Sequence, residues 1–367
     1  MKKVLLISEQ GIIYEASPAR YQLVYELKQA GYETYVFHRG RITCSENRRD
    51  IDHFTDTRNL SMEKIRKKIL EINPDYVIAS TDGDTTLLFP ILSRMAKTFF
   101  IYYNLEIYTP DRAKRLHGST RGKFDRVLWK VVYLQEKLKE IYFTRKCSLF
   151  IIQDTLRKEI SKKYFIAHPN TMLIPNSYIY EEKNYGGNSL SGVVYSGVLK
   201  QFRAEEMMKA LQKMPDFPIA FSGTCDKWFR KQFRILSSSH PAMQLFEQSL
   251  PPEKHLQFLK QYAVGLVWYD HYEDDNEEYI GLASGKLFRH LSIGQPVIVS
   301  NSQGLAKVIH HYKVGLVIDD LSELPEAYQK IMDNYFYYQN RVKQVYKAKF
   351  DFSKNIKSLL EEMRRMR

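Results

Sequence analysis

Short apolar runs alternate with amphipathic segments along the whole chain, a pattern typical of a parallel β-sheet covered by helices on both faces. In the first half, six such runs predict strands at residues 2–8, 32–37, 74–80, 98–104, 147–153 and 171–177. Amphipathic segments predict helices at 18–31, 61–73 and 85–96, and a long helical region precedes residue 147. Pro18 and Gly31 stand where a helix commonly begins and ends.

The pattern starts again near residue 191, with apolar runs that predict strands at 191–197, 217–223, 243–250, 263–269 and 313–319. Between the last two, the stretch 284–309 predicts a helix, a Gly-Gln-Pro turn, a short strand and a second helix. We therefore predict two doubly wound α/β domains in tandem. They span 1–177 and 193–340, with a polar linker at 178–192 between them and a basic helix at 341–367 after them.

The composition is that of a folded protein, since 44% of the 367 residues are hydrophobic and 26% are charged. No apolar run reaches the length of a transmembrane helix, and the run at 4–7 is too short for a signal peptide. Cys44, Cys147 and Cys225 form no CxxC pair, which fits a reducing cytoplasm and no metal site. The net charge of +13 suits a polyanion, a membrane surface or a phosphorylated ligand.

Doubly wound sheets bind ligands beyond the carboxyl ends of their strands, so residues that follow strands are the candidates for function. The loop after the first strand lacks G-x-G-x-x-G, which argues against a nicotinamide or flavin enzyme. Glu106 follows the strand at 98–104, between Tyr103 and Tyr108. A carboxylate in aromatic surroundings can have a raised pKa and act as a base. The alternative is a loop glutamate held in a salt bridge.

The first two strands of the second half end in glycines. Gly197 allows close approach of a ligand, and Arg203 follows in the next helix, whose N-terminus attracts anions. Ser222 and Gly223 repeat the arrangement at the next strand. An arginine at such a place can grip a phosphate, although many α/β loops hold one.

The helix that begins near residue 284 completes this set. Ser284 is a candidate N-cap, Gly285 exposes backbone N–H groups, and Lys286 adds a positive charge, with Arg289 one turn later. If Arg203 lies on the same sheet edge, the cations and the helix start together suit a diphosphate. The alternative is an ordinary solvated helix start.

Two motifs in this half carry a family resemblance. K-L-F-x-x-L-x-x-G-Q-P-V-I, from Lys286 to Ile298, is similar to the donor-site helix and G-x-P-V-I turn of nucleotide-sugar glycosyltransferases of the GT-B fold. Y-S-G-V-L-K-Q-F-R at 195–203 resembles their phosphate loop, with Gly197 and Arg203 in the places of its glycine and lysine. I-P-N-S at 174–177 is similar to the segment that precedes their interdomain linker.

In element order the resemblance covers essentially the whole chain. It implies an α/β GT-B architecture, with two Rossmann-like domains facing across a cleft and a C-terminal helix that returns to the N-terminal domain. It also implies that the donor binds the C-terminal domain and the acceptor the N-terminal one. The resemblance further implies no metal requirement and no cofactor, with the nucleoside-diphosphate sugar as co-substrate.

The chain departs from the larger retaining branch of this family, which carries two glutamates eight residues apart. Gly281 and Arg289 stand at those places, with Glu277 and Glu278 nearby but out of register. The second glutamate usually binds the nucleotide ribose, so ribose recognition must differ here. Val198 also stands where the family often has a phosphate-binding arginine.

Positive charge is concentrated at 112–146, where eleven Lys and Arg minus three Asp and Glu leave +8. Apolar and aromatic residues recur there at near-helical spacing: Phe124, Val127, Leu128, Trp129, Val131, Tyr133, Leu138 and Tyr142. A basic amphipathic helix with aromatic residues predicts contact with an anionic membrane surface. An ordinary core-packed helix with a solvated basic face is the alternative. Nucleic acid is not expected, because no nucleic-acid module accompanies the charge.

These features predict a metal-independent glycosyltransferase that moves a sugar from a nucleoside diphosphate to a surface glycan, glycolipid or glycoprotein. Glu106, Arg203 and Lys286 are its expected catalytic residues. Donor binding is assigned to Gly197, Arg203, Ser222, Gly223, Ser284, Gly285, Lys286 and Arg289. A non-catalytic GT-B-like accessory subunit of a glycosyltransferase complex is the alternative, and a nucleotide-sugar epimerase would share the fold. We expect the protein in the cytoplasm, peripheral on the inner face of the membrane, as an oligomer or beside a partner glycosyltransferase.

Overall fold

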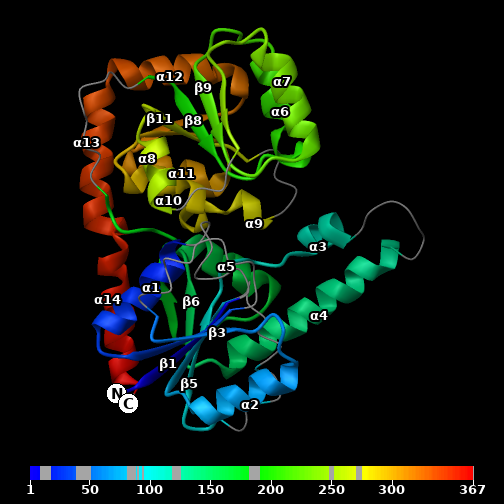
Figure 1. Cartoon of the computed structure of the whole chain (residues 1–367), viewed down its shortest axis with the longest axis vertical. Coiled ribbons are helices and arrows are strands. Elements are labelled where there is room, and N and C mark those ends of the chain that lie inside the picture. Colours follow the sequence, from blue (N-terminus) through cyan, green and yellow to red (C-terminus); the bar gives the residue numbers. More distant parts are fainter. Residues whose placement is uncertain are drawn as a thin grey trace. The chain divides into compact units, whose positions relative to one another are not determined.

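A computed structural model describes residues 1–8, 18–38, 51–80, 88, 91–92, 95–117, 125–181, 191–247, 252–269 and 275–366 (Figure 1). The chain folds as two units. Unit 1 comprises Met1–Asn176, Glu273–Asn276 and Phe352–Arg367, and unit 2 comprises Ser177–Tyr272 and Glu277–Asp351. Each unit is built on a parallel sheet, so the predicted pair of Rossmann-like α/β domains is confirmed.

The sheet of unit 1 has seven strands in the order β3-β2-β1-β4-β5-β6-β7. Every neighbouring pair is parallel. Every residue of β4 and β6 is buried, as expected of central parallel strands covered on both faces. The strands are β1 (Lys3–Ser8), β2 (Glu33–His38), β3 (His53–Asp56), β4 (Tyr76–Ser80), β5 (Phe99–Tyr103), β6 (Leu149–Ile152) and β7 (Thr171–Leu173).

The helices of unit 1 include the last one of the chain. In Figure 1, α14 lies beside α1, and the buried Tyr76 hydroxyl of β4 donates a hydrogen bond to the Met363 carbonyl of α14. The predicted return of the C-terminal helix to the N-terminal domain is therefore confirmed. These helices are α1 (Pro18–Gln29), α2 (Met62–Ile72), α3 (Pro110–His117), α4 (Asp125–Lys146), α5 (Thr155–Tyr164) and α14 (Phe352–Arg365).

The sheet of unit 2 has six parallel strands in the order β10-β9-β8-β11-β12-β13. Its central strands are short apolar runs that are entirely buried. The strands are β8 (Val193–Ser196), β9 (Ile219–Ser222), β10 (Gln244–Phe246), β11 (Val264–Val267), β12 (Val297–Ser300) and β13 (Gly315–Ile318). The helices are α6 (Gln201–Leu211), α7 (Lys227–Ser237), α8 (Pro252–Leu259), α10 (Gly285–Ser292), α11 (Gln303–Tyr312), α12 (Leu324–Asp333) and α13 (Tyr335–Val345); the short α9 (Asp275–Glu278) has residues in both units.

The structure adds one strand that was not predicted, leaves two predicted segments largely undescribed and corrects one prediction. The edge strand β3 was not predicted, because its sequence, His-Phe-Thr-Asp, is short, polar and not buried. The predicted helix at 85–96 and the core of the linker, 182–190, fall mostly or wholly on residues that the structure does not describe. The tail at 341–367 is not one helix: α13 is followed by a π-helical turn at Tyr346–Phe350, and Asp351 leaves helical geometry with ψ 120° before α14 begins. No Pro or Gly marks this break in the sequence, so helical periodicity alone missed it.

Candidate functional site

The carboxyl ends of β8 and β9 meet through two glycines. A side chain on Gly223 would place its Cβ 1.7 Å from the Gly197 carbonyl oxygen, so the two backbones touch there. The Gly197 N–H donates to the carbonyl of Ser222, which is buried. At Gly197 the nearest group to an added Cβ would be Lys286 Cε, at 2.9 Å. From the sequence, we expected a ligand to approach these glycines closely. In the structure, the Gly197 backbone lies against Gly223, and the Lys286 side chain lies against Gly197.

Helix α10 carries the predicted cations on one face. Ser284 caps it, its Oγ accepting from the Leu287 N–H at 3.2 Å, as predicted. Leu287, Phe288 and Leu291 are buried, whereas Lys286 and Arg289 lie one turn apart on a half-buried face.

The end of α10 is set by the Gly-Gln-Pro turn that the sequence predicted. Gly294 has φ +73°, which only glycine adopts readily, and the Gln295 N–H closes the turn onto the His290 carbonyl at 3.1 Å.

Lys286 lies in an aromatic cage. Its Nζ donates to the Tyr195 hydroxyl at 2.9 Å and to the Trp268 carbonyl at 3.2 Å. The same atom lies 4.9 Å from the centre of the Tyr195 ring and 4.2 Å from that of Tyr269. The Tyr269 hydroxyl is also 3.0 Å from the Ser284 Oγ. Neutral oxygens and aromatic π faces favour a charged ammonium group. The cage therefore holds the positive charge of Lys286 itself at the carboxyl ends of β8 and β11.

Arg289 makes a second polar cluster at the same edge. Its Nη1 donates to the Oγ of the buried Ser196 at 3.0 Å, and that oxygen is 3.1 Å from His255 Nε2 on α8. Burial, followed by the charge of Arg289, lowers the pKa of His255 to about 3. Ser196 thus accepts a hydrogen bond from the Arg289 guanidinium and forms a second one with the neutral His255 imidazole.

Arg203 lies in the first turn of α6, but its side chain is outside what the structure describes. The start of that helix has no side-chain cap from Lys200. Instead, Asp226 accepts from the Gln201 N–H at 3.0 Å and also caps α7 by accepting from the Phe229 N–H at 2.7 Å. A carboxylate therefore already lies at the N-terminus of α6, where the sequence predicted an anionic ligand.

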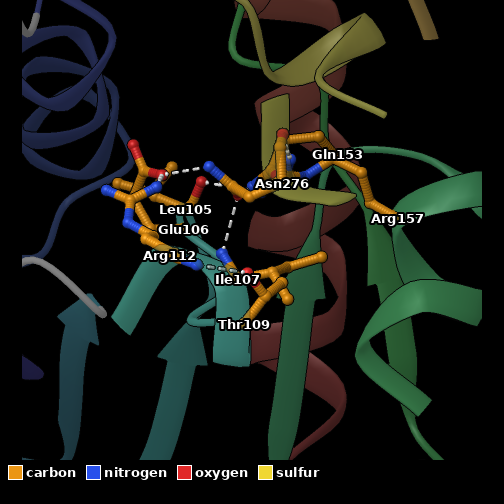
Figure 2. A network of polar contacts seen from close by, with 8 residues as sticks. All are labelled: Leu105, Glu106, Ile107, Thr109, Arg112, Gln153, Arg157 and Asn276. Atoms are coloured by element: carbon orange, nitrogen blue, oxygen red, sulfur yellow. Dashed lines mark hydrogen bonds and ion pairs between the residues drawn. The ribbon is translucent and has the colours of Figure 1, made fainter. Parts of the chain in front are cut away.

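In unit 1, Glu106 is held by an arginine and an amide (Figure 2). Its Oε2 accepts from Arg112 Nη1 at 2.7 Å and from Asn276 Nδ2 at 2.9 Å, while the side chain stays half-exposed, at 49%. Partial desolvation acts to raise the pKa of Glu106, but the charges of Arg112 and Arg157 and the two hydrogen bonds outweigh it and lower the pKa. The predicted raised pKa is therefore wrong, because the sequence did not reveal these cationic neighbours. The carboxylate is ionised at neutral pH.

Sequence reasoning missed the residues that complete these arrangements. Tyr195, His255 and Asn276 come from different elements, and Arg157 is a fully buried cation that composition would place at the surface. The only local signal was Tyr195 beside Gly197. Among the described residues, no group of three or more His, Cys, Asp and Glu is arranged to hold a metal ion.

Within the basic stretch at 112–146, the structure describes α3 and α4, whereas residues 118–124, with Arg121, Lys123 and Phe124, lie outside the described residues. Part of α4 extends away from the sheet of unit 1 (Figure 1). Four aliphatic side chains on one side of α4 are 38–59% exposed: Leu128, Val131, Leu134 and Leu138. Exposed cations of α4 include Lys130, Arg145 and Lys146. No described helix has the length and apolar character needed to cross a bilayer.

Known proteins resemble this chain in sequence and in fold. Residues 193–355 match the family described as "Glucosyltransferase 3-like, C-terminal domain". No curated protein matches the chain in sequence.

Solved structures match nearly the whole chain. A glycosyltransferase from Rickettsia africae superposes with a TM-score of 0.69 at 12% identity, covering 100% of this chain and 98% of that one. WaaG, a glycosyltransferase involved in lipopolysaccharide biosynthesis, gives 0.67 at 11% identity, with 97% and 98% covered. Anabaena Alr3699/HepE, solved in complex with UDP, gives 0.64 at 12%, with 99% of each chain covered. The chain therefore has the GT-B fold of the glycosyltransferases it resembles, and its second half matches the Glucosyltransferase 3-like C-terminal domain.

Proposed function

We propose that this protein is a glycosyltransferase that transfers a sugar from a nucleoside diphosphate to a hydroxyl of a surface glycan, glycolipid or glycoprotein. The observation that carries the proposal is the cation-bearing face of α10, with Lys286 and Arg289 directed to the carboxyl ends of β8 and β11. The family match over the same unit and a UDP-bound structural neighbour support a nucleotide donor there. Ligands of doubly wound sheets bind at this edge.

In the proposed reaction, the acceptor oxygen forms a bond to the anomeric carbon, and the bond from that carbon to the diphosphate oxygen breaks. The leaving diphosphate gains negative charge, which Lys286, Arg203 and the start of α10 would stabilise. If the configuration inverts, the acceptor proton passes to the Glu106 carboxylate. We propose that no metal takes part, because these cations would serve the diphosphate instead.

The diphosphate contacts can be measured by calorimetric titration of a nucleoside diphosphate and its parent nucleoside. Lys286→Ala and Arg203→Ala should each weaken diphosphate binding by roughly 10- to 150-fold, about 1.5–3 kcal/mol, and leave nucleoside binding unchanged. Lys330→Ala is the matched control, because this exposed lysine pairs with Glu326 on α12. If neither Lys286→Ala nor Arg203→Ala weakens diphosphate binding, the donor does not bind at these residues.

Arg289 distinguishes two donor geometries. If it takes over ribose recognition, Arg289→Ala should weaken nucleoside and diphosphate alike, whereas a member of the phosphate clamp should behave as Lys286 does. Its hydrogen bond to Ser196 directs one guanidinium nitrogen toward the strand end. Ser196→Ala removes that bond without changing charge, and so tests whether the arginine must be held in place.

The accessory-subunit alternative is favoured by one feature, namely that Gly281 and Arg289 replace the glutamate pair of the retaining branch. An accessory subunit would bind a nucleoside diphosphate without transferring or hydrolysing any nucleotide sugar. A panel of nucleotide sugars, screened first by thermal shift and then for release of nucleoside diphosphate, separates the two functions. An epimerase would convert the sugar without needing an acceptor.

We also propose that α4 docks on an anionic membrane surface, where lipid-linked acceptors reside. The exposed aliphatic row Leu128, Val131, Leu134 and Leu138, together with the cations of this helix, fits an interfacial helix. Vesicle sedimentation should show binding to anionic but not neutral lipid, and the binding should decline as salt rises. Leu134→Ser with Leu138→Ser should weaken it. Equal binding to both lipids, or none, would end this proposal.

A further inference from the structure

Asn276 lies at the centre of the polar network around Glu106 (Figure 2). Its side chain is almost fully buried. The Oδ1 atom accepts from the Ile107 N–H at 2.9 Å and from Arg157 Nη2 at 3.0 Å, and Nδ2 donates to Glu106 Oε2 at 2.9 Å. Asn276 comes from Glu273–Asn276, a stretch of unit 1 that interrupts the sequence of unit 2.

The orientation of this amide is determined by its donors. A backbone N–H and a guanidinium can only donate, so both must face Oδ1, and Nδ2 must then face the carboxylate. Arg157 is itself fixed, because Nε donates to Gln153 Oε1 at 2.8 Å and Nη2 also donates to the Leu105 carbonyl at 3.1 Å. Turning the amide over would place Oδ1 against the Glu106 carboxylate, acceptor against acceptor, and the NH₂ group against the Arg157 guanidinium, donor against donor. The network therefore presents a hydrogen-bond donor to Glu106 by construction.

We propose that Asn276 is a positioning residue whose amide N–H fixes the Glu106 carboxylate for its role as base. The proposal rests on the function proposed above. Arg112 supplies the second fixed donor to the same oxygen, so the carboxylate is oriented from two sides. These donors favour the ionised form, consistent with the lowered pKa of Glu106. The two donors lower the basicity of the Glu106 carboxylate, and its fixed position relative to the acceptor hydroxyl offsets that loss in the proposed reaction.

The sharpest variant is Asn276→Asp, which keeps the shape of the side chain. One carboxylate oxygen can still accept from Ile107 and Arg157, but the other now opposes Glu106 at hydrogen-bond distance. Two carboxylates so close titrate as a pair, with one pKa strongly raised. The acid limb of the turnover profile should therefore move toward higher pH by roughly one unit or more, with little change in the KM for the donor. Asp275→Asn is the matched control, because Asp275 pairs with Lys163 and Tyr164.

A carboxyl-carbon NMR titration provides a readout independent of activity. The Glu106 signal, assigned by its loss in Glu106→Gln, should titrate below the ordinary range in the wild type and in two coupled steps, one of them above that range, in Asn276→Asp. Absence of that change would overturn the proposal. So would an Asn276→Asp enzyme whose turnover falls while the acid limb of its pH profile stays at the wild-type pH. Glu106→Gln tests the base itself and should lower turnover by roughly 100-fold with donor affinity unchanged. Wild-type turnover in Glu106→Gln would refute the base and hence the positioning role, while leaving the proposed donor site intact.

Discussion

Replacing Glu140 by glutamine should stabilise the protein at alkaline pH but not at acid pH. Glu140 lies on α4 with 3% of its surface exposed, and its carboxyl accepts from the Tyr102 hydroxyl and from Asn104 Nδ2. Burial raises its pKa to about 7, although the Tyr102 and Asn104 hydrogen bonds and the charge of Lys139 oppose the rise. Charging this group at high pH therefore costs stability.

The magnitude follows from linkage between protonation and folding. The folded pKa of about 7 lies above the ordinary value of 4.5, so this group's contribution is fully present below pH 4.5 and is lost as pH rises through 7. Between pH 5.5 and 8.5 the wild type should lose about 2 kcal/mol of unfolding free energy through Glu140 alone. Glutamine carries no charge at either pH. Its carbonyl can accept from Tyr102. Its amide can donate to Asn104 once the Asn104 side chain turns over, so that Oδ1, for which the described residues provide no partner, replaces Nδ2 opposite residue 140.

Urea unfolding of Glu140→Gln and wild type at the two pH values measures this effect. The stability difference in favour of the variant should grow by about 2 kcal/mol from pH 5.5 to 8.5. Glu159→Gln is the control, because the side chain of Glu159 on α5 is 64% exposed, and its difference from wild type should change little with pH. A difference for Glu140→Gln that is the same at both pH values would refute the reasoning.

Three further predictions concern packing and metal. Gly265→Ala should destabilise the protein by about 3 kcal/mol or more in thermal unfolding, because its Cβ would lie 2.3 Å from Cγ of the buried His290; an unchanged Tm would contradict this packing. Tyr76→Phe should cost about 1–2 kcal/mol in urea unfolding and leave diphosphate affinity unchanged, because it removes the hydrogen bond from β4 to α14. EDTA should not lower transfer activity; a loss that Mg²⁺ or Mn²⁺ restores would disprove metal independence.

The order of strands and helices was largely predictable because buried strands of this fold are runs of apolar residues that can be recognised in the sequence. β8, β9, β11 and β12 are continuous apolar runs and are wholly buried. The helix start at Ser284 and the Gly294 turn were likewise readable, since caps and positive φ angles depend on neighbouring residues. β3 and the break at Asp351 left no such trace.

The partners of the site residues were not predictable, because polar contacts join residues that are distant in the sequence. Asn276 is 170 positions from Glu106, and Lys286 is 91 from Tyr195. Periodicity reports which side chains are buried, not which donor faces which acceptor. That limit explains both the wrong pKa direction for Glu106 and the unforeseen cage around Lys286.

The return of α14 to unit 1 has a consequence for synthesis. A chain released as far as Asn176 has every strand of the first sheet but not the helix that covers α1 and binds Tyr76. From Asn176 to the end of α14 at Arg365 is 365 minus 176, or 189 residues, which a ribosome makes in about 10–40 seconds. During that interval the surface of unit 1 that α14 covers stays exposed. Residues 1–176 expressed alone would therefore lack both α14 and the Glu273–Asn276 stretch that completes unit 1.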